Sequence, residues 1–107
     1  MTTPADLDLV IRGGQVVTPE GGGPWDVGVE GERIVAVAAA GTLPTQGVRV
    51  IDASGKLVIP GGIDPHVHTG WPIPALAGGM TLSAGPGQVS AAALHGGTTT
   101  LADFAVW

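Results

Sequence analysis

The chain has 107 residues, enough for one small domain and well short of the roughly 250 residues of a typical closed α/β barrel. Hydrophobic residues make up 44% and charged residues 12%, with 19 glycines and 9 prolines, which is typical of an ordered, turn-rich chain that buries much of its sequence. The net charge is -5 and the four cationic side chains do not cluster, so we expect no nucleic-acid partner and no anionic membrane surface.

The absence of cysteine excludes disulfides and thiolate metal sites, and it fits a reducing cytoplasm. Residues 1–6 lack the cationic start and apolar core of a secretion signal, and no apolar run reaches the 18 or so residues of a membrane-spanning helix. We therefore expect a soluble, unexported, cytoplasmic protein.

The first half of the chain predicts a small β-sheet with no cluster of catalytic residues. Apolar and β-branched residues occur in short runs that are separated by glycine-rich turns. In chain order we expect a hairpin of residues 7–12 and 15–18 closed by Gly13-Gly14, a loop over 19–24, a strand pair of 25–30 and 33–38, a linker over 39–47, a strand over 48–52, and a turn at 53–55.

The central stretch continues the apolar run 56–59 through a Pro-Gly-Gly turn to two histidines, His66 and His68. If residues 59–68 form one strand, the two imidazoles leave the same face and can bind one metal ion. Asp64 has the same parity and is placed to orient a ligand from below. The alternative is two ordinary strand histidines that bind nothing, but their position at the end of a strand before a glycine-rich loop favours the metal site.

Residues 69–86 are rich in Gly, Pro and Ala, and this stretch is long for an ordinary connection. We interpret it as an active-site loop with Trp71 as a candidate wall of the substrate pocket; the alternative is a surface loop that never touches substrate. Residues 88–95 predict a short helix that ends at Gly96-Gly97. His95 in its last turn is expected to cap the helix or face solvent rather than to act in catalysis.

Residues 98–104 predict a second strand, continuing into 105–107, so that strand, helix and strand form a βαβ unit of a parallel sheet. Asp103 lies near the carboxyl end of this strand, level with the histidine pair if the strands are in register. It could accept a hydrogen bond from a metal ligand, or it could be satisfied by neighbouring loop amides.

Two segments resemble the cyclic amidohydrolases of the amidohydrolase superfamily, and hydantoinase and dihydropyrimidinase are the most similar members. The first is residues 51–68, which end in Pro60-Gly61-Gly62-Ile63-Asp64-Pro65-His66-Val67-His68, and the second is residues 95–104. The resemblance implies an N-terminal portion only: residues 1–58 as part of a β-sandwich and residues 59–107 as the first two strands and first helix of a (β/α)8 barrel.

By the same resemblance, His66 and His68 bind the more buried of two divalent ions. A carboxylated lysine, two further histidines and a catalytic aspartate complete the family's site. The chain offers only His95 and Lys56 as a further histidine and a lysine, in other elements, so we expect no catalytic residue within it. Zinc is the first choice of metal, and manganese, iron or cobalt would suit the same ligands.

The implied reaction is hydrolysis of a cyclic amide, at its C–N bond, by a metal-bound hydroxide. We expect the chain to work only with a second polypeptide or downstream segment that completes the barrel, as part of a homo-oligomer of the complete unit. The alternative functions are a non-catalytic scaffold or oligomerisation protein of the same fold, and a free-standing β-module that binds a partner. Retention of both histidines speaks against the scaffold, and the βαβ unit speaks against the free-standing module.

Overall fold

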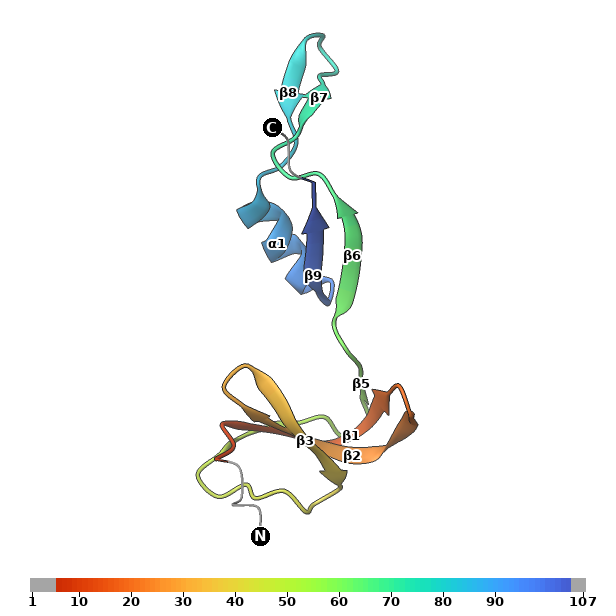
Figure 1. Cartoon of the computed structure of the whole chain (residues 1–107), viewed down its shortest axis with the longest axis vertical. Helices are drawn as coiled ribbons and strands as arrows, with labels where there is room; N and C mark the ends of the chain where they lie inside the picture. Colours follow the sequence, from red (N-terminus) through yellow and green to blue (C-terminus); the bar gives the residue numbers. More distant parts are fainter. Residues whose placement is uncertain (1–5, 105–107) are drawn as a thin grey trace. The chain divides into compact units, whose positions relative to one another are not determined.

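The computed structural model describes residues 6–104 and divides the chain into two compact units, Met1–Pro60 and Gly61–Trp107 (Figure 1). The described part is mostly β-structure with one helix. The expectation for the first five residues, and the continuation of the last strand into residues 105–107, lie outside the described residues.

The first unit is a five-stranded sheet in the order β3-β2-β1-β4, with β5 also paired to β1. Strands β1, β2 and β3 form an antiparallel meander, whereas β4 and β5 run parallel to different halves of β1. Their bounds are β1 Leu9–Thr18, β2 Gly21–Glu30, β3 Arg33–Ala39, β4 Arg49–Asp52 and β5 Leu57–Val58. The predicted pairing of residues 25–30 with 33–38 is thus confirmed.

The core of this unit is small and lies along β1 and β2. The hydrophobic residues that are buried among those described are Val10, Val16, Val27 and Ala53. Asp26 is buried beside them at 2% exposure, and its carboxylate accepts hydrogen bonds from the backbone N–H of Gly13 at 3.1 Å and of Gly41 at 2.7 Å. Because a buried carboxylate is costly unless its oxygens are bonded, Asp26 fastens both backbone segments to the sheet.

The predicted hairpin at Gly13-Gly14 is wrong. β1 runs without a turn from Leu9 to Thr18, and its register against β2 shifts between Ile11 and Gly14, which is a bulge. Gly13 has φ of +78°, a conformation that suits a bulge as well as a turn. The chain instead reverses between Thr18 and Gly21, so part of the expected loop over 19–24 is the start of β2.

The strand expected over residues 59–68 is present but shorter, and it is separate from the apolar run before it. The apolar run ends as the two-residue strand β5, which pairs with β1 in the first unit, and a new strand, β6 Gly62–Val67, begins in the second unit. Residues 59–61 between them lie outside any strand, and Pro60 has no N–H to donate to a sheet.

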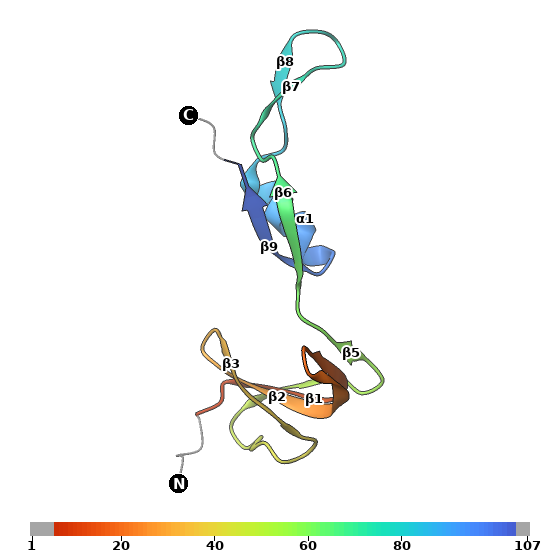
Figure 2. The same ribbon diagram turned by 45° about the vertical axis from the view of Figure 1, so that its right-hand side comes forward.

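The second unit joins two parallel strands to the helix that separates them in sequence. β6 pairs with β9 Thr98–Asp103, and α1 Pro86–His95 packs on β9. This confirms the predicted strand, helix, strand order. Between β6 and α1, the expected irregular loop contains a short antiparallel hairpin, β7 Pro72–Pro74 and β8 Met80–Leu82, which both views show beyond the carboxyl ends of β6 and β9 (Figures 1 and 2).

The predicted helix over 88–95 is confirmed with two more residues at its start. Pro86 occupies the first turn, where its missing N–H costs nothing, and the N–H of Gly96 closes the helix on the carbonyls of Ala92 and Ala93. Within residues 6–104, no helix has the length and apolar character needed to span a membrane.

Candidate metal centre

The two histidines converge at the carboxyl end of β6. His66 is the second-last residue of β6, and His68 directly follows the strand. Their Nε2 atoms are 3.0 Å apart and their rings meet edge to face, with centroids 4.9 Å apart. The structure therefore brings together the two side chains that the sequence singled out, with both ring nitrogens directed to one point.

This spacing fits the family's metal site. Two imidazole nitrogens bound to one zinc ion at about 2.0–2.1 Å and at a tetrahedral angle lie about 3.3–3.4 Å apart. The observed 3.0 Å is within a few tenths of an ångström of that value. A single proton shared between the two nitrogens gives the same distance without metal.

Part of the family's ligand set is absent from the neighbourhood of the pair. Across residues 6–104 no group of three or more His, Cys, Asp or Glu side chains is placed to share a metal ion. His95, the third histidine, bonds through Nδ1 to the carbonyl of Ala91 at 2.8 Å, one turn back in α1. It contributes nothing to the pair.

Aromatic rings surround the histidines. Phe104, directly after β9, lies 4.7 Å from the ring of His66 and 5.0 Å from that of His68. Trp71 lies 4.5 Å from the ring of His68, in a tilted arrangement. Both imidazoles are exposed to solvent and each contacts an aromatic ring.

The two aspartates near the histidines bond to backbone groups. Asp64 Oδ1 accepts the N–H of His66 at 3.1 Å, and Asp103 accepts the N–H of Thr69 at 3.2 Å and the Thr69 hydroxyl. The hydrogen bonds from Thr69, first of all the hydroxyl, lower the pKa of the Asp103 carboxyl, and the Phe104 N–H and nearby His68 act in the same direction. A role for either aspartate in orienting a metal ligand stays a prediction.

Ser83, just after β8, ties the hairpin back to the histidines. Its Oγ accepts the N–H of Trp71 at 2.8 Å and donates to the carbonyl of His68 at 2.6 Å. Sequence reasoning missed Ser83, Thr69 and Phe104, because Ser83 and Phe104 reach the pair from distant parts of the sequence and Thr69 bonds to a residue 34 positions away. The one available signal was Phe104, the only phenylalanine of the chain, at a strand end level with the histidines.

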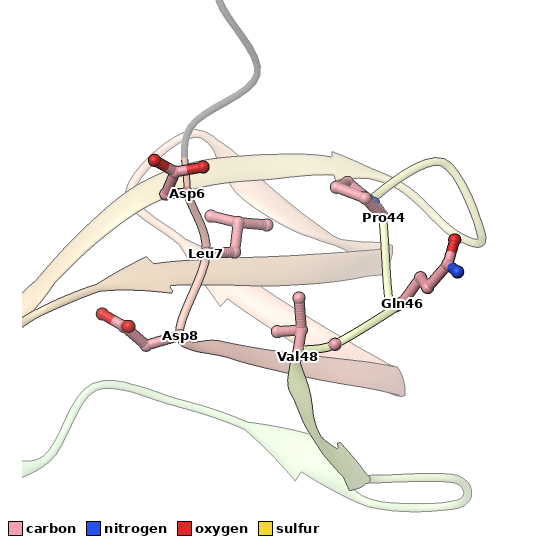
Figure 3. Close-up of a pocket in the computed structure, with 7 residues that line it drawn as sticks. Asp6, Leu7, Asp8, Pro44, Gln46 and Val48 are labelled. Atoms are coloured by element: carbon pink, nitrogen blue, oxygen red, sulfur yellow. The ribbon is translucent and has the colours of Figure 1, made fainter.

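A separate hollow of about 360 Å³ lies in the first unit (Figure 3). It is lined by residues just before β1 and just before β4: Asp6, Leu7, Asp8, Pro44, Gln46, Gly47 and Val48. None of these is a histidine, and one carboxylate oxygen of Asp8 is already bonded to the N–H of Gly31 at 2.5 Å. The two candidate metal ligands are therefore not part of this hollow.

Known proteins similar to this chain include enzymes named D-hydantoinase and dihydropyrimidinase. The chain is 44% identical over 100 residues to a D-hydantoinase of Streptomyces coelicolor, and 41% identical over 102 residues to a dihydropyrimidinase of Rattus norvegicus. These matches cover 91% and 92% of the chain but 21% and 19% of the relatives. The crystal structure of a D-hydantoinase from Bacillus sp. AR9 matches with a TM-score of 0.78 and 42% identity, over 92% of the chain and 20% of that structure.

No protein-family model matches the chain. The two relatives and the solved structure nevertheless match this chain over more than nine tenths of its length. The chain belongs to the hydantoinase and dihydropyrimidinase family, and it spans about a fifth of the length of the relatives it matches.

Proposed function

We propose that the chain supplies the first two metal ligands of a cyclic amide hydrolase. Residues 1–58 would form part of a small β-sandwich, and residues 59–107 would begin a (β/α)8 barrel, with β6 and β9 as its first two strands. The parallel pairing of β6 with β9 and the helix between them support this arrangement. Active sites of such barrels lie at the carboxyl ends of the strands, which is where His66 and His68 are found.

The observation that carries the proposal is the 3.0 Å separation of the two Nε2 atoms in a chain of this family. His66 and His68 would hold a divalent cation, zinc by first choice, as one half of a binuclear site. When bound, such cations activate water as a nucleophile and polarise the carbonyl under attack. The remaining ligands and the proton-transfer group would come from a segment or polypeptide that completes the barrel.

The residues of this chain would bind the divalent cation, orient its ligands and line part of the substrate pocket. The two histidines would donate ring nitrogens, Phe104 would fix both rings, and the backbone bond from His66 to Asp64 would hold the strand in shape. Trp71, whose ring centroid lies 4.5 Å from that of His68, would form part of the wall of the substrate pocket. The substrate would be a small ring with an amide bond, as the names of the relatives suggest.

The test uses the completed enzyme, meaning residues 1–107 expressed with the part of the Streptomyces coelicolor D-hydantoinase that the chain does not match. His66→Ala and His68→Ala should each lower bound metal and reduce turnover at least about a hundredfold. The matched control is His95→Ala, which removes an imidazole bonded only within α1 and should leave both quantities unchanged.

Metal content is measured by elemental analysis, and hydrolysis is followed over hydantoins, dihydropyrimidines, allantoin and dihydroorotate. The substrate with the highest kcat/KM identifies the ring that the enzyme prefers. Full metal occupancy together with unreduced turnover in the double histidine variant would refute the proposal. Metal binding without hydrolysis of any cyclic amide would instead favour a non-catalytic protein of the same fold.

A further inference from the structure

One carboxylate, that of Asp103, bonds to residues on both sides of the histidine pair. It accepts the backbone N–H of Thr69 at 3.2 Å and the hydroxyl of the same residue, which directly follows His68. The same Oδ1 accepts the N–H of Phe104 at 2.8 Å. Thr69 and Asp103 are 34 residues apart in sequence, so these bonds join the end of β6 to the end of β9.

The bonds from Thr69 to Asp103 lie where the regular pairing of β6 with β9 ends. The register of β6 against β9 shifts between Asp64 and Val67, and Pro65 in that interval has no N–H to donate. Beyond the shift the strands still pair at Val67 and Asp103, and the N–H of Phe104 bonds to the Val67 carbonyl at 3.3 Å. His68 lies one residue past this last pair, so the bonds from Thr69 to Asp103 hold the backbone on its carboxyl side.

Phe104 is bonded to Asp103 through its backbone and contacts both imidazoles with its ring. Its backbone N–H is bonded to Asp103, and its ring lies 4.7 Å from His66 and 5.0 Å from His68. Fixing the backbone of Phe104 thus fixes the face against which the two rings rest, and with it the convergence of their Nε2 atoms.

We propose that Asp103 is a positioning residue that holds Thr69 and Phe104, and through them preorganises His66 and His68 for one divalent cation. The inference rests on the proposed function. Asp103 would neither touch the cation nor take part in the reaction, and its contribution would be the geometry of the two ring nitrogens before the metal arrives. A ligand pair held in the bound geometry loses less conformational freedom on binding, so affinity rises.

The sharpest variant is Thr69→Val, which keeps the shape of the side chain and removes the hydroxyl that Asp103 accepts. In the completed enzyme it should weaken Co²⁺ binding about tenfold, the lower end of what the loss of such supporting bonds costs. Thr69→Ser restores the hydroxyl and should bind within about twofold of the unmodified protein. Asp103→Ala, which also removes the acceptor of the Thr69 N–H and one of the two acceptors of the Phe104 N–H, should weaken binding further.

Thr100→Val is the matched control, because it makes the same chemical change in β9 at a hydroxyl with no hydrogen-bond partner among residues 6–104. Affinity is measured by titrating metal-free protein with Co²⁺ and following its visible absorption, whose band also reports ligand geometry. Thermal unfolding of each metal-free variant is recorded in parallel. A merely structural role would lower the unfolding midpoint without altering the Co²⁺ affinity or spectrum.

Unchanged Co²⁺ affinity in Thr69→Val and Asp103→Ala would overturn the inference, as would equal losses in Thr69→Val and Thr100→Val or no rescue by Thr69→Ser. These outcomes differ from failure of the proposed function. In that case the unmodified protein itself would not bind Co²⁺, or His66→Ala and His68→Ala would bind it as tightly as the unmodified protein.

Discussion

At the scale of single residues, the Nε2 atoms of His66 and His68 lie 3.0 Å apart, and the local spacing of the two rings is enough to bring them together. Two imidazoles two residues apart in an extended segment leave the same face, whatever the rest of the chain does. Thr69 and Ser83 were not identifiable in this way, because threonine and serine are common in loops and their roles arise from contacts 34 and 15 residues away. Sequence reasoning therefore found the candidate ligands and missed what holds them.

At the same scale, Trp71 is predicted to contribute to substrate binding more than to folding. Its ring is half-buried and lies 4.5 Å from that of His68, while its backbone is held by Ser83 independently of the indole. In the completed enzyme, Trp71→Ala should raise KM about tenfold for at least one cyclic amide, the loss expected for an aromatic contact in a pocket. The unfolding midpoint should shift little.

Steady-state kinetics over the panel of cyclic amides measures this effect, and Trp71→Phe is the control that keeps an aromatic face. If KM is unchanged for every substrate in Trp71→Ala, the tryptophan is not part of the pocket.

At the scale of elements, strand existence was more predictable than strand continuity. Gly13-Gly14 has the backbone freedom for either a turn or a bulge. In the structure it forms a bulge, in which the N–H of Gly13 bonds to the buried carboxylate of Asp26 on the neighbouring strand. Likewise, the apolar run at Leu57–Val58 pairs with β1 and does not continue into β6. Both outcomes depend on partners distant in sequence, which a local pattern does not contain.

The start of β6 is predicted to require glycine. A Cβ built on Gly61 would overlap the side chain of Thr99 in β9, including its Cβ, so a larger residue fits there only if Thr99 or the backbone shifts. Gly61→Ala should destabilise the protein by about 1–3 kcal/mol, the usual cost of overpacking. Thr99→Ala should recover part of that loss, because it removes the Thr99 atoms nearest to the added methyl group.

Thermal or denaturant unfolding of the completed enzyme measures the change. Gly87→Ala is the control: it adds the same methyl group within α1, where nothing lies within 4 Å, and should stabilise the helix by up to about 1 kcal/mol. A Gly61→Ala variant as stable as the unmodified protein would contradict the close approach of these strands.

At the scale of the whole molecule, each unit by itself leaves large apolar side chains in solvent. In the first unit Ile34 is 69% and Leu57 71% exposed, and in the second Ile63 is 71% exposed. Of the residues described, four hydrophobic ones are buried, although 44% of the sequence is hydrophobic. The composition predicted that much of the chain is buried, yet few side chains of the described residues are; burial of the exposed apolar ones by further protein is a prediction.

We therefore predict that residues 1–107 are inactive by themselves. They carry two histidines of the proposed site, and the two-stranded parallel sheet of β6 and β9 has open edges that favour pairing with more strands. Completing it would bury an interface of more than about 2,000 Å², as expected for a domain core divided between two pieces.

Expressed alone, the chain should aggregate or bind Co²⁺ weakly. Expressed as the completed enzyme, it should elute as a single species, bind two divalent ions and hydrolyse a cyclic amide. Size-exclusion chromatography, metal analysis and the substrate panel distinguish these results, and a monomeric 107-residue chain that hydrolyses a cyclic amide unaided would disprove the prediction.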